Sequence, residues 1–313
     1  MEKNKIRFSI IVIHRNRFDL LHSCLLSIIG SISNNDEIIL IDNNSSDDSM
    51  SKLKSTNYYQ KIKIIANKCN FGYGESCNQG MKAASGKYFI LCNNDVKLNQ
   101  NALTLFYEYL NKKNIGIIGP QMLTPSGSYM NSYSTIPFDL LSQLDLVGRP
   151  RRSKEIKSLA PVENLRGACL AVNKEMVKEL GGYDEDFYFY HEETEWCFRI
   201  NQSKNWKVMF SPEIKIVHIG GGTTENVFKE SRIEFFRSRI KFWQKIFPFR
   251  TRLLVYLINL PKLLLDLIFY CFMTLVTFGK VKTYRRKALD RSIVLVWLVL
   301  GMPKKWGLQD KCN

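Results

Sequence analysis

The stretch FILCNNDVKL, residues 89–98, places four apolar residues directly before Asn93, Asn94 and Asp95. An apolar run that ends in polar residues is typical of a buried β-strand whose last residues reach the edge of a sheet. Ligands of open α/β sheets bind at that edge, beyond the carboxyl ends of the strands. The stretch therefore predicts a buried strand with a binding site at its end.

Apolar strands alternate with a helical pattern around this stretch. The run FSIIVI (8–13) is rich in β-branched residues, and residues 17–32 carry apolar side chains at helical spacing. Further strands are predicted over 37–43, 61–67 and 88–95. Because this alternation is typical of parallel sheets covered by helices on both faces, we expect an α/β fold.

The composition is that of a globular protein. The chain has 313 residues, 45% of them hydrophobic and 24% charged, enough for one large domain or two smaller ones. Its eight cysteines include no CxxC pair, which argues against a zinc site. The N-terminal apolar run lacks a small-residue cleavage site, so we interpret it as a strand and expect reduced thiols in a cytoplasmic protein.

The net charge of +16 is concentrated at one end of the chain. Residues 226–313 contain 18 lysines and arginines but only five aspartates and glutamates, whereas the rest of the chain is nearly balanced. This basic segment is interleaved with Leu, Ile, Phe and Trp, which suits an anionic membrane surface better than a nucleic acid. We therefore expect membrane contact and no nucleic-acid binding.

Polar residues follow three of the predicted strands. Each cluster alone is typical of a turn, but parallel strands bring their carboxyl ends to one edge of the sheet. The glycines of NFGYGESCNQGMKAASGKY (70–88) match neither the dinucleotide-binding nor the P-loop pattern. The clustered residues are His14, Arg15, Asn16 and Arg17 after the first strand, Asp42, Asn43, Asn44, Ser45, Ser46, Asp47 and Asp48 after the second, and Asn93, Asn94 and Asp95 after the fourth.

These segments together resemble glycosyltransferase family 2, the inverting enzymes with a GT-A fold. The resemblance rests, in this order, on SIIVIHRNRFDLLHSCLLSI, IILIDNNSSDDS, NFGYGESCNQGMKAASGKYFILCNNDV, and RGACLAVNKEMVKELGGYDEDFYFYHEETEWCFR followed by VHIGGGTT. It extends from about Phe8 to Thr224 and is strongest to the rhamnosyltransferase-like branch that builds bacterial surface polysaccharides. It implies a Rossmann-like, mostly parallel central sheet flanked by helices.

The resemblance also implies a nucleotide-sugar donor and a divalent metal. Asp95 stands where the family has its metal-binding carboxylate, and His218 matches a histidine near the metal or diphosphate. Since Asp95 is the only carboxylate of its motif, Mg²⁺ or Mn²⁺ would take its remaining ligands from the diphosphate and water. The residues implied in binding the nucleotide sugar are Asn16, Arg17, Asp42, Asn44, Asn70, Gly72, Asn78, Asn94 and Asp95.

The acidic segment FYFYHEETEWCFR (187–199) is the candidate for the catalytic base. Solvated acids in the first turn of a helix are the structural alternative. Carboxylates among aromatic residues are partly desolvated, which raises their pKa and suits a general base. The resemblance implies Glu193 as the base that deprotonates the acceptor hydroxyl in one inverting displacement, and Glu192 is its competitor.

Four further residues are expected at the acceptor. They are Arg166 and Gly167, Glu195, and Trp196, whose ring offers a face to a sugar. Glu195 has an alternative role, because Arg199 lies four residues later on the same predicted helix and can form an ion pair with it.

Residues 252–278 form an apolar segment that is long enough to span a membrane. Lys262 and Asp266 oppose insertion, and the polar residues recur at about the helical period of 3.6, which predicts an interfacial helix kinked at Pro261. Packing of the polar stripe against the catalytic domain and an inserted hairpin are the alternatives. The stripe comprises residues 252, 256, 259, 262, 266, 270, 274 and 277.

The sequence thus predicts three parts. Residues 1–120 form a nucleotide-sugar-binding half, residues 121–225 an acceptor-binding half with the base, and residues 226–313 a basic membrane-associating tail. We expect an enzyme at the cytoplasmic face of a bacterial inner membrane that transfers a hexose, rhamnose from dTDP-rhamnose being favoured, to a lipid-linked glycan. The alternatives are a UDP-galactose or UDP-glucose transferase and a non-catalytic carbohydrate-binding homologue.

Overall fold

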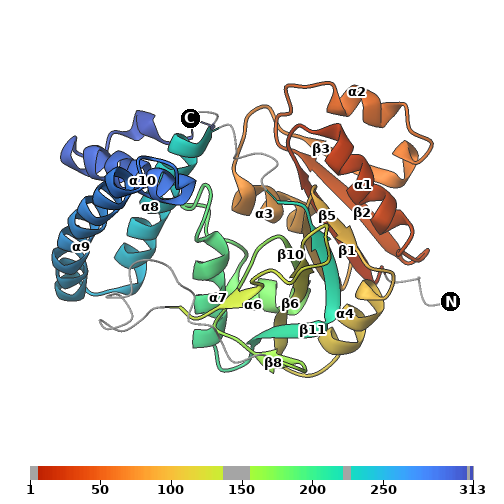
Figure 1. The fold of residues 1–313 in the computed structure, drawn as a ribbon. Helices are drawn as coiled ribbons and strands as arrows, with labels where there is room; N and C mark the ends of the chain where they lie inside the picture. The colour runs from red at the N-terminus through yellow and green to blue at the C-terminus, as the bar shows by residue number, and fades with distance from the viewer. Residues whose placement is uncertain (1–5, 137–155, 221–226, 309–310, 313) are drawn as a thin grey trace.

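The computed structural model describes residues 6–136, 156–220, 227–308 and 311–312. It contains an α/β body with one large sheet and a tail of three long helices to one side of it (Figure 1). The predicted α/β class and the basic helical tail are confirmed.

The first part of the sheet is parallel, as the sequence predicts. Its strands run in the order β3, β2, β1, β4, and all three neighbouring pairs are parallel. Each predicted strand is present, and the helix predicted over 17–32 is α1 (Phe18–Ile29). The four strands are β1 (Phe8–His14), β2 (Asp36–Asp42), β3 (Ile62–Ala66) and β4 (Tyr88–Asn93).

The sheet continues through the predicted acceptor half. Strand β10 (Cys169–Asn173) runs antiparallel between β4 and β6 (Ile115–Leu123), and β11 (Lys207–His218) pairs in parallel with β6. The short β5 (Val96–Leu98) and β8 (Ala160–Pro161) pair with β11. The two predicted halves therefore share one nine-stranded sheet of the described residues, and the boundary near 120 stays a prediction.

Helices cover both faces of the sheet. Successive side chains of β1 point alternately to the two faces and so contact different helices. Ile10 and Val12 point into one core with α1, α2 and α4, whereas Ile11 and Ile13 point into the other with α3, α6 and α7. The helices are α2 (Ser49–Lys54), α3 (Tyr73–Ala83), α4 (Ala102–Leu110), α6 (Lys174–Leu180) and α7 (Glu192–Gln202), with a 3₁₀ turn at Tyr59–Lys61.

The segment predicted to be irregular, 124–160, is only partly within the described residues. Its described portion contains β7 (Tyr133–Ser134), which pairs with β9 (Asn164–Leu165). Residues 137–155, including GRPRRSK, lie outside the described part of the chain.

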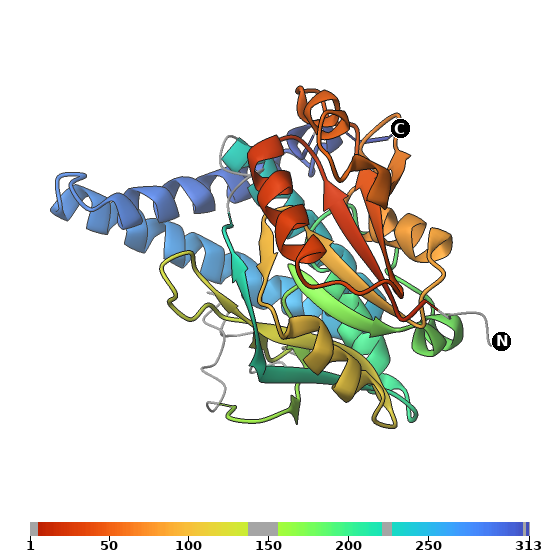
Figure 2. The ribbon, with the colours of Figure 1, turned by 90° about the vertical axis from the view of Figure 1, so that its right-hand side faces the viewer.

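The tail consists of α8 (Phe228–Ile246), α9 (Phe249–Val276) and α10 (Lys282–Val299), followed by a 3₁₀ turn at Lys304–Trp306. Figure 2 shows α9 and α10 as a hairpin that projects from the body. Helix α9 contains Pro261, and its residues Leu257–Val276 are long and apolar enough to cross a membrane.

Two residues of the polar stripe of α9, Asp266 and Tyr270, contact α10. Asp266 Oδ2 lies 3.4 Å from Arg291 Nε, and the Tyr270 hydroxyl accepts a hydrogen bond from Lys287 Nζ at 3.2 Å. The opposite side of α9 exposes large apolar residues such as Leu265, Ile268 and Phe272. Packing on α10 thus covers Asp266 and Tyr270 and leaves an apolar face of α9 exposed.

The structure corrects the expectation that all eight cysteines are free thiols. Cys69 and Cys312 form a disulfide, although 243 positions separate them. The sequence could not show this pairing, because it depends on the chain end returning to the loop before α3, where Cys312 N also donates to Asn70 O. Cys24, Cys77, Cys92, Cys169, Cys197 and Cys271 are free, and only Cys271 is exposed.

Gly80 tests the packing of α3 on β1. A Cβ atom at Gly80 would lie 2.3 Å from Ile11 Cγ2 in the core. We expect Gly80→Ala to lower the free energy of unfolding by about 1–3 kcal/mol, because overpacking outweighs the better helix propensity of alanine. Urea-induced unfolding of both proteins measures this change in the free energy of unfolding.

The matched control is Gly30→Ala at the end of α1. Gly30 has a φ of −70°, and an added Cβ would meet nothing closer than 3.4 Å. Its unfolding free energy should stay within about 0.5 kcal/mol of the wild-type value. Equal effects of the two substitutions would contradict the close packing of α3.

Candidate active site

The three polar strand ends meet at one edge of the sheet. His14 at the end of β1 pairs in register with Asp42 at the end of β2, and Ile13 pairs with Asn93 at the end of β4. Strand β10 starts at the same edge, where Cys169 pairs with Cys92. The predicted convergence of these strand ends is therefore confirmed.

Asn16 and Arg17 lie in a strained turn after β1, with φ angles of 59° and 65°. The turn is held against the loop after β2. The Asn16 backbone N–H donates to Ser45 Oγ at 2.9 Å, and Asn16 Oδ1 accepts from the Ser46 N–H at 2.8 Å. The Arg17 N–H donates to Asp47 Oδ2 at 2.7 Å, so the two loops form one unit.

His14 links the ends of β1 and β4. Its ring is fully buried, and Nδ1 lies 2.9 Å from Asn94 Nδ2. Burial lowers the pKa of His14 to about 4, although Asp42 and Asp47 oppose the shift, so the ring is neutral at neutral pH. Sequence reasoning placed His14 in the polar cluster after the first strand but gave it no specific role.

Asp42 and Asn44 lie at the start of the loop after β2. Asp42 is buried, and its Oδ1 accepts from Ser45 Oγ at 2.5 Å and from the Ser45 N–H at 3.2 Å. Asn44 is exposed and adopts a φ of 63°. Both lie where the resemblance places the base and ribose, and that role stays a prediction.

Asn43 and Asn70 join the β2 loop to the segment before α3. Asn43 Nδ2 donates to Asn70 Oδ1 at 2.7 Å and to Gly72 O at 3.1 Å, while Asn43 Oδ1 accepts from the Phe71 N–H. Asn70 Oδ1 also accepts from the Gly72 N–H at 3.0 Å. Sequence reasoning assigned Asn70 to the nucleotide but missed that Asn43 organises its loop.

Gly72 permits a close approach of two loops. Its φ is 85°, and an added Cβ would lie 2.1 Å from Tyr188 O. The neighbouring Tyr73 N–H donates to the same carbonyl at 3.2 Å. A larger residue here would separate the start of α3 from the segment that leads to the acids of α7.

Asp95 and His218 lie side by side. Asp95 Oδ2 is 3.3 Å from His218 Nε2, and the Ile219 N–H donates to Asp95 O at 3.0 Å. Asp95 is buried, and its Oδ1, like Asn93 Oδ1 and His218 Nδ1, lacks a hydrogen-bond partner. Unpaired oxygen and nitrogen atoms of this kind are the ligands that a divalent ion prefers.

The described residues contain no group of three or more His, Cys, Asp or Glu side chains that could hold a metal alone. A divalent ion at Asp95 and His218 would need its other ligands from outside the protein, and its binding here stays a prediction.

Glu192 and Glu193 begin α7 and are desolvated. Burial raises the pKa of Glu193, and it raises the pKa of Glu192 further, with the charge of Glu193 adding to the effect. Each carboxylate has one buried oxygen, Oε2, without a hydrogen-bond partner. Glu192 is buried and Glu193 is half-buried, and two adjacent desolvated carboxylates resist being ionised together.

The two acids face different neighbours. Glu192 packs against α3, since a Cβ at Gly74 would lie 3.6 Å from its Cβ. Glu193 instead lies against Gly167, and nearby Arg166 partly offsets the rise in its pKa. Glu193, Arg166 and Gly167 therefore lie close together, and their roles at the acceptor stay a prediction.

The segment around Gly167 connects Glu193 to the strand ends. Gly167 O accepts from the Tyr73 hydroxyl at 2.7 Å, and Ala168 O accepts from the Asn93 N–H at 2.9 Å. Glu193 and the Asn93–Asp95 turn are thus attached to the same short segment.

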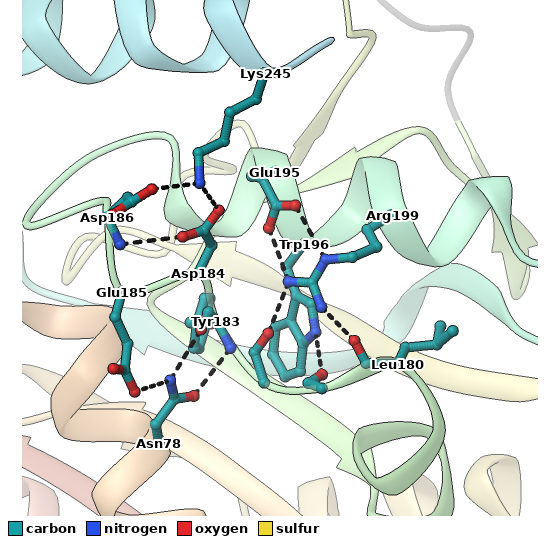
Figure 3. Close-up of polar contacts among 12 residues, drawn as sticks. Asn78, Leu180, Tyr183, Asp184, Glu185, Asp186, Glu195, Trp196, Arg199 and Lys245 are labelled. Atoms are coloured by element: carbon teal, nitrogen blue, oxygen red, sulfur yellow. Dashed lines mark hydrogen bonds and ion pairs between the residues drawn. The ribbon is translucent and has the colours of Figure 1, made fainter.

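The predicted ion pair between Glu195 and Arg199 is confirmed. Arg199 donates two hydrogen bonds to the carboxylate, at 2.8 and 3.0 Å, and also donates to Leu180 O and Gly182 O (Figure 3). The pair therefore fixes the loop after α6, and a contact of Glu195 with an acceptor stays a prediction.

Trp196 corrects the expectation of a sugar platform. Its side chain is 0% exposed, lies in the core beside Tyr183, and donates through Nε1 to Gly181 O at 3.0 Å (Figure 3). No face of the ring reaches solvent. The aromatic run of the sequence did not show which side of α7 faces the core.

Asn78 holds the same loop from α3. Its amide donates to Tyr183 O and Glu185 Oε1 and accepts from the Tyr183 N–H, at 2.9–3.0 Å (Figure 3). These bonds give Asn78 a structural role, and contact with a nucleotide stays a prediction.

Comparison with known proteins identifies relatives among sugar transferases. The low-salt glycan biosynthesis hexosyltransferase Agl10 of Haloferax volcanii is 25% identical over 177 residues, which cover 55% of this chain and 56% of that protein. The N-acetylglucosaminyl-diphospho-decaprenol L-rhamnosyltransferase of Mycobacterium tuberculosis is 22% identical over 58% of this chain and 66% of its own length. The matches thus span less than two thirds of these relatives.

Solved structures with similar folds are also glycosyltransferases. The mannosyltransferase PcManGT of Pyrobaculum calidifontis, solved with GDP-Man and Mn²⁺, superposes with a TM-score of 0.59 at 14% identity over 96% of this chain and 88% of that one. GalNAc-T7, solved with UDP, GalNAc and Mn²⁺, gives 0.57 at 18% identity over 76% and 48%. These likenesses show the GT-A fold.

A family model described as Glycosyl transferase family 2 matches residues 9–181, more than half of the chain. The match includes all three strand ends and stops before the acids of α7, whose roles therefore rest on geometry. The chain belongs to glycosyltransferase family 2.

Proposed function

We propose that the protein is an inverting hexosyltransferase that uses Glu193 as its base. The observation that carries the proposal is the placement of a desolvated carboxylate beside Gly167, on the segment that also holds the Asn93–Asp95 turn. A desolvated carboxylate with a raised pKa is suited to accept a proton near neutral pH.

The donor would bind across the ends of β1, β2 and β4. Asp42 would accept a hydrogen bond from the nucleobase of the donor. The Asn16–Arg17 turn would contact the same nucleotide. A divalent ion bound by Asp95 and His218 would supply neutralisation of the departing diphosphate. The buried, unpartnered Asp95 Oδ1 supports this assignment.

Glu193 would act on the acceptor. It takes the hydroxyl proton while the acceptor oxygen forms a bond to the anomeric carbon, and the carbon–oxygen bond to the diphosphate breaks with its electron pair leaving on the phosphate. Glu193 takes this role rather than Glu192, because the charge of nearby Arg166 stabilises its ionised form. One displacement inverts the anomeric configuration.

The donor is proposed to be dTDP-rhamnose and the acceptor a lipid-linked glycan of surface-polysaccharide synthesis. The rhamnosyltransferase relative carries a diphospho-lipid in its name, and another relative is the O-antigen biosynthesis protein RfbC of Myxococcus xanthus. The alternative donors are UDP-galactose and UDP-glucose, since a cholesterol galactosyltransferase is also similar.

The tail would attach the enzyme to an anionic membrane on its cytoplasmic side. The apolar face of α9 is exposed while Asp266 and Tyr270 of its polar stripe contact α10, and the surrounding tail is strongly basic. This combination is typical of helices that lie in a membrane interface. The exposed residues include Leu257, Leu264, Leu265, Ile268, Phe272 and Leu275.

The base assignment predicts different effects at neighbouring acids. Glu193→Gln should lower kcat about 10²–10⁴-fold, because the amide cannot take a proton. Glu192→Gln mimics a protonated carboxyl and should change kcat less than about tenfold. Release of nucleoside diphosphate with a panel of nucleotide sugars, including dTDP-rhamnose, UDP-galactose and UDP-glucose, measures both.

The pH dependence follows from the raised pKa. Glu193 must be ionised to act, so kcat should fall as the pH drops through a value above 4.5, the ordinary pKa of glutamic acid. The assignment is wrong if Glu193→Gln keeps full turnover while Glu192→Gln abolishes it. Lack of turnover with every sugar would favour the non-catalytic carbohydrate-binding alternative.

The membrane assignment predicts that two exposed residues one heptad apart on α9 govern attachment. The double substitution Leu265→Ser and Phe272→Ser should weaken binding to phosphatidylglycerol vesicles about tenfold or more, because apolar burial is lost. Co-sedimentation measures the bound fraction. Leu26→Ser on α1, also exposed, is the control and should bind normally. Unchanged binding of the double variant would exclude α9 as the anchor.

A further inference from the structure

Helix α8 lies between the loop that carries the base and the tail hairpin. On one side, Ser238 Oγ donates to Phe189 O at 2.8 Å, and Ser231 Oγ lies 2.6 Å from the Tyr190 hydroxyl. Phe235 also contacts the ring of His191, with ring centroids 5.0 Å apart. Since Glu192 and Glu193 follow His191 directly, α8 borders the predicted acceptor site.

Two arginines of α8 and one of α10 lie near this contact, and we name Arg232, Arg239 and Arg291 the arginine cluster. Arg232 and Arg239 are seven residues apart and share one face of the helix. Arg232 Nη2 donates to Asp290 Oδ2 at 2.7 Å, and Arg291 pairs with both Asp290 and Asp266.

Arg239 is the member of the cluster without a carboxylate. Among the described residues its guanidinium contacts the ring of Trp243, 4.8 Å from the centroid, and forms no ion pair. Burial and the charges of Arg232 and Arg291 lower the pKa of Arg239 to about 10, so it is still charged at neutral pH. Arg239 is therefore a half-buried cation that shares a helix face with Arg232 and has no ion pair among the described residues.

The cluster also connects the segment before Glu193 to the polar side of α9. Arg232 lies over the ring of Phe235, 5.2 Å from its centroid, and Phe235 in turn contacts His191. Arg291 reaches α9 through Asp266 and lies over the ring of Tyr270. The cluster thus contacts both the segment that leads to Glu193 and helix α9.

We propose that the arginine cluster binds the diphosphate of a lipid-linked acceptor, with Arg239 as its principal ligand. This inference rests on the proposed transferase function. Guanidinium groups form charge-assisted, often paired hydrogen bonds with phosphate oxygens. An acceptor of the form sugar–diphosphate–lipid would place its sugar at Glu193, its diphosphate at the cluster and its lipid along α9.

The test uses the full-length protein and binding alone. Farnesyl diphosphate serves as the probe and farnesol as its phosphate-free partner, each titrated by calorimetry in detergent without nucleotide. Arg239→Gln should weaken farnesyl diphosphate binding about tenfold or more, the loss expected for a charged hydrogen bond, and leave farnesol binding unchanged. Arg239→Lys keeps the charge and should restore much of the binding.

Two further variants make the result specific. Arg250→Gln removes the same charge from an exposed position at the start of α9 and should bind both probes normally. Asp95→Asn alters the proposed metal site and should also bind farnesyl diphosphate normally. Loss of binding in Asp95→Asn but not in Arg239→Gln would place the diphosphate at the donor site and overturn the proposal.

Binding to vesicles distinguishes an acceptor diphosphate site from a site for ordinary lipid headgroups. If Arg239→Gln weakens binding to phosphatidylglycerol vesicles but not to farnesyl diphosphate, the cluster binds a headgroup and the acceptor assignment is wrong. Melting temperatures verify that the variants are folded. Because no turnover is measured, Glu193→Gln should bind the probe normally even if it is inactive, so failure here and failure of the transferase proposal are distinct results.

Discussion

The insertion of β10 antiparallel between β4 and β6 is the constraint on which the site depends. The carboxyl ends of parallel strands all lie at one edge of the sheet. The first residue of a strand can lie at that edge only if the strand is antiparallel to them. Because β10 is reversed, Gly167 and Ala168 arrive at that edge together, and the Ala168 carbonyl binds the Asn93 N–H. This reversal brings the acceptor half of the chain to the donor half within one sheet.

Desolvation gives the acids of α7 their chemical character. The segment before them adopts two left-handed residues, Tyr190 and His191, which favour glycine and are costly in other side chains. Hydrogen bonds from α8 and the close approach at Gly72 hold this segment in place. The position of Glu193 thus depends on the tail helix α8 as well as on the catalytic body.

Much of the nucleotide half could be predicted from the sequence, because strand periodicity and the polar residues at strand ends are local signals. The pair of Glu195 and Arg199 was also predictable from helical spacing. The buried face of Trp196 and the disulfide of Cys312 were not, since both depend on which distant segments pack together. The same limit applies to the polar stripe of α9, whose period was clear but whose contacts with α10 were not.

A crystal structure with Mn²⁺ and a nucleoside diphosphate would test the central claim most directly, because the anomalous signal locates the metal. The account predicts Mn²⁺ in contact with Asp95 and His218, the diphosphate across the ends of β1 and β4, and the Glu193 carboxylate facing the same space. Metal bound away from Asp95, or a Glu193 carboxylate directed away from the diphosphate, would contradict it.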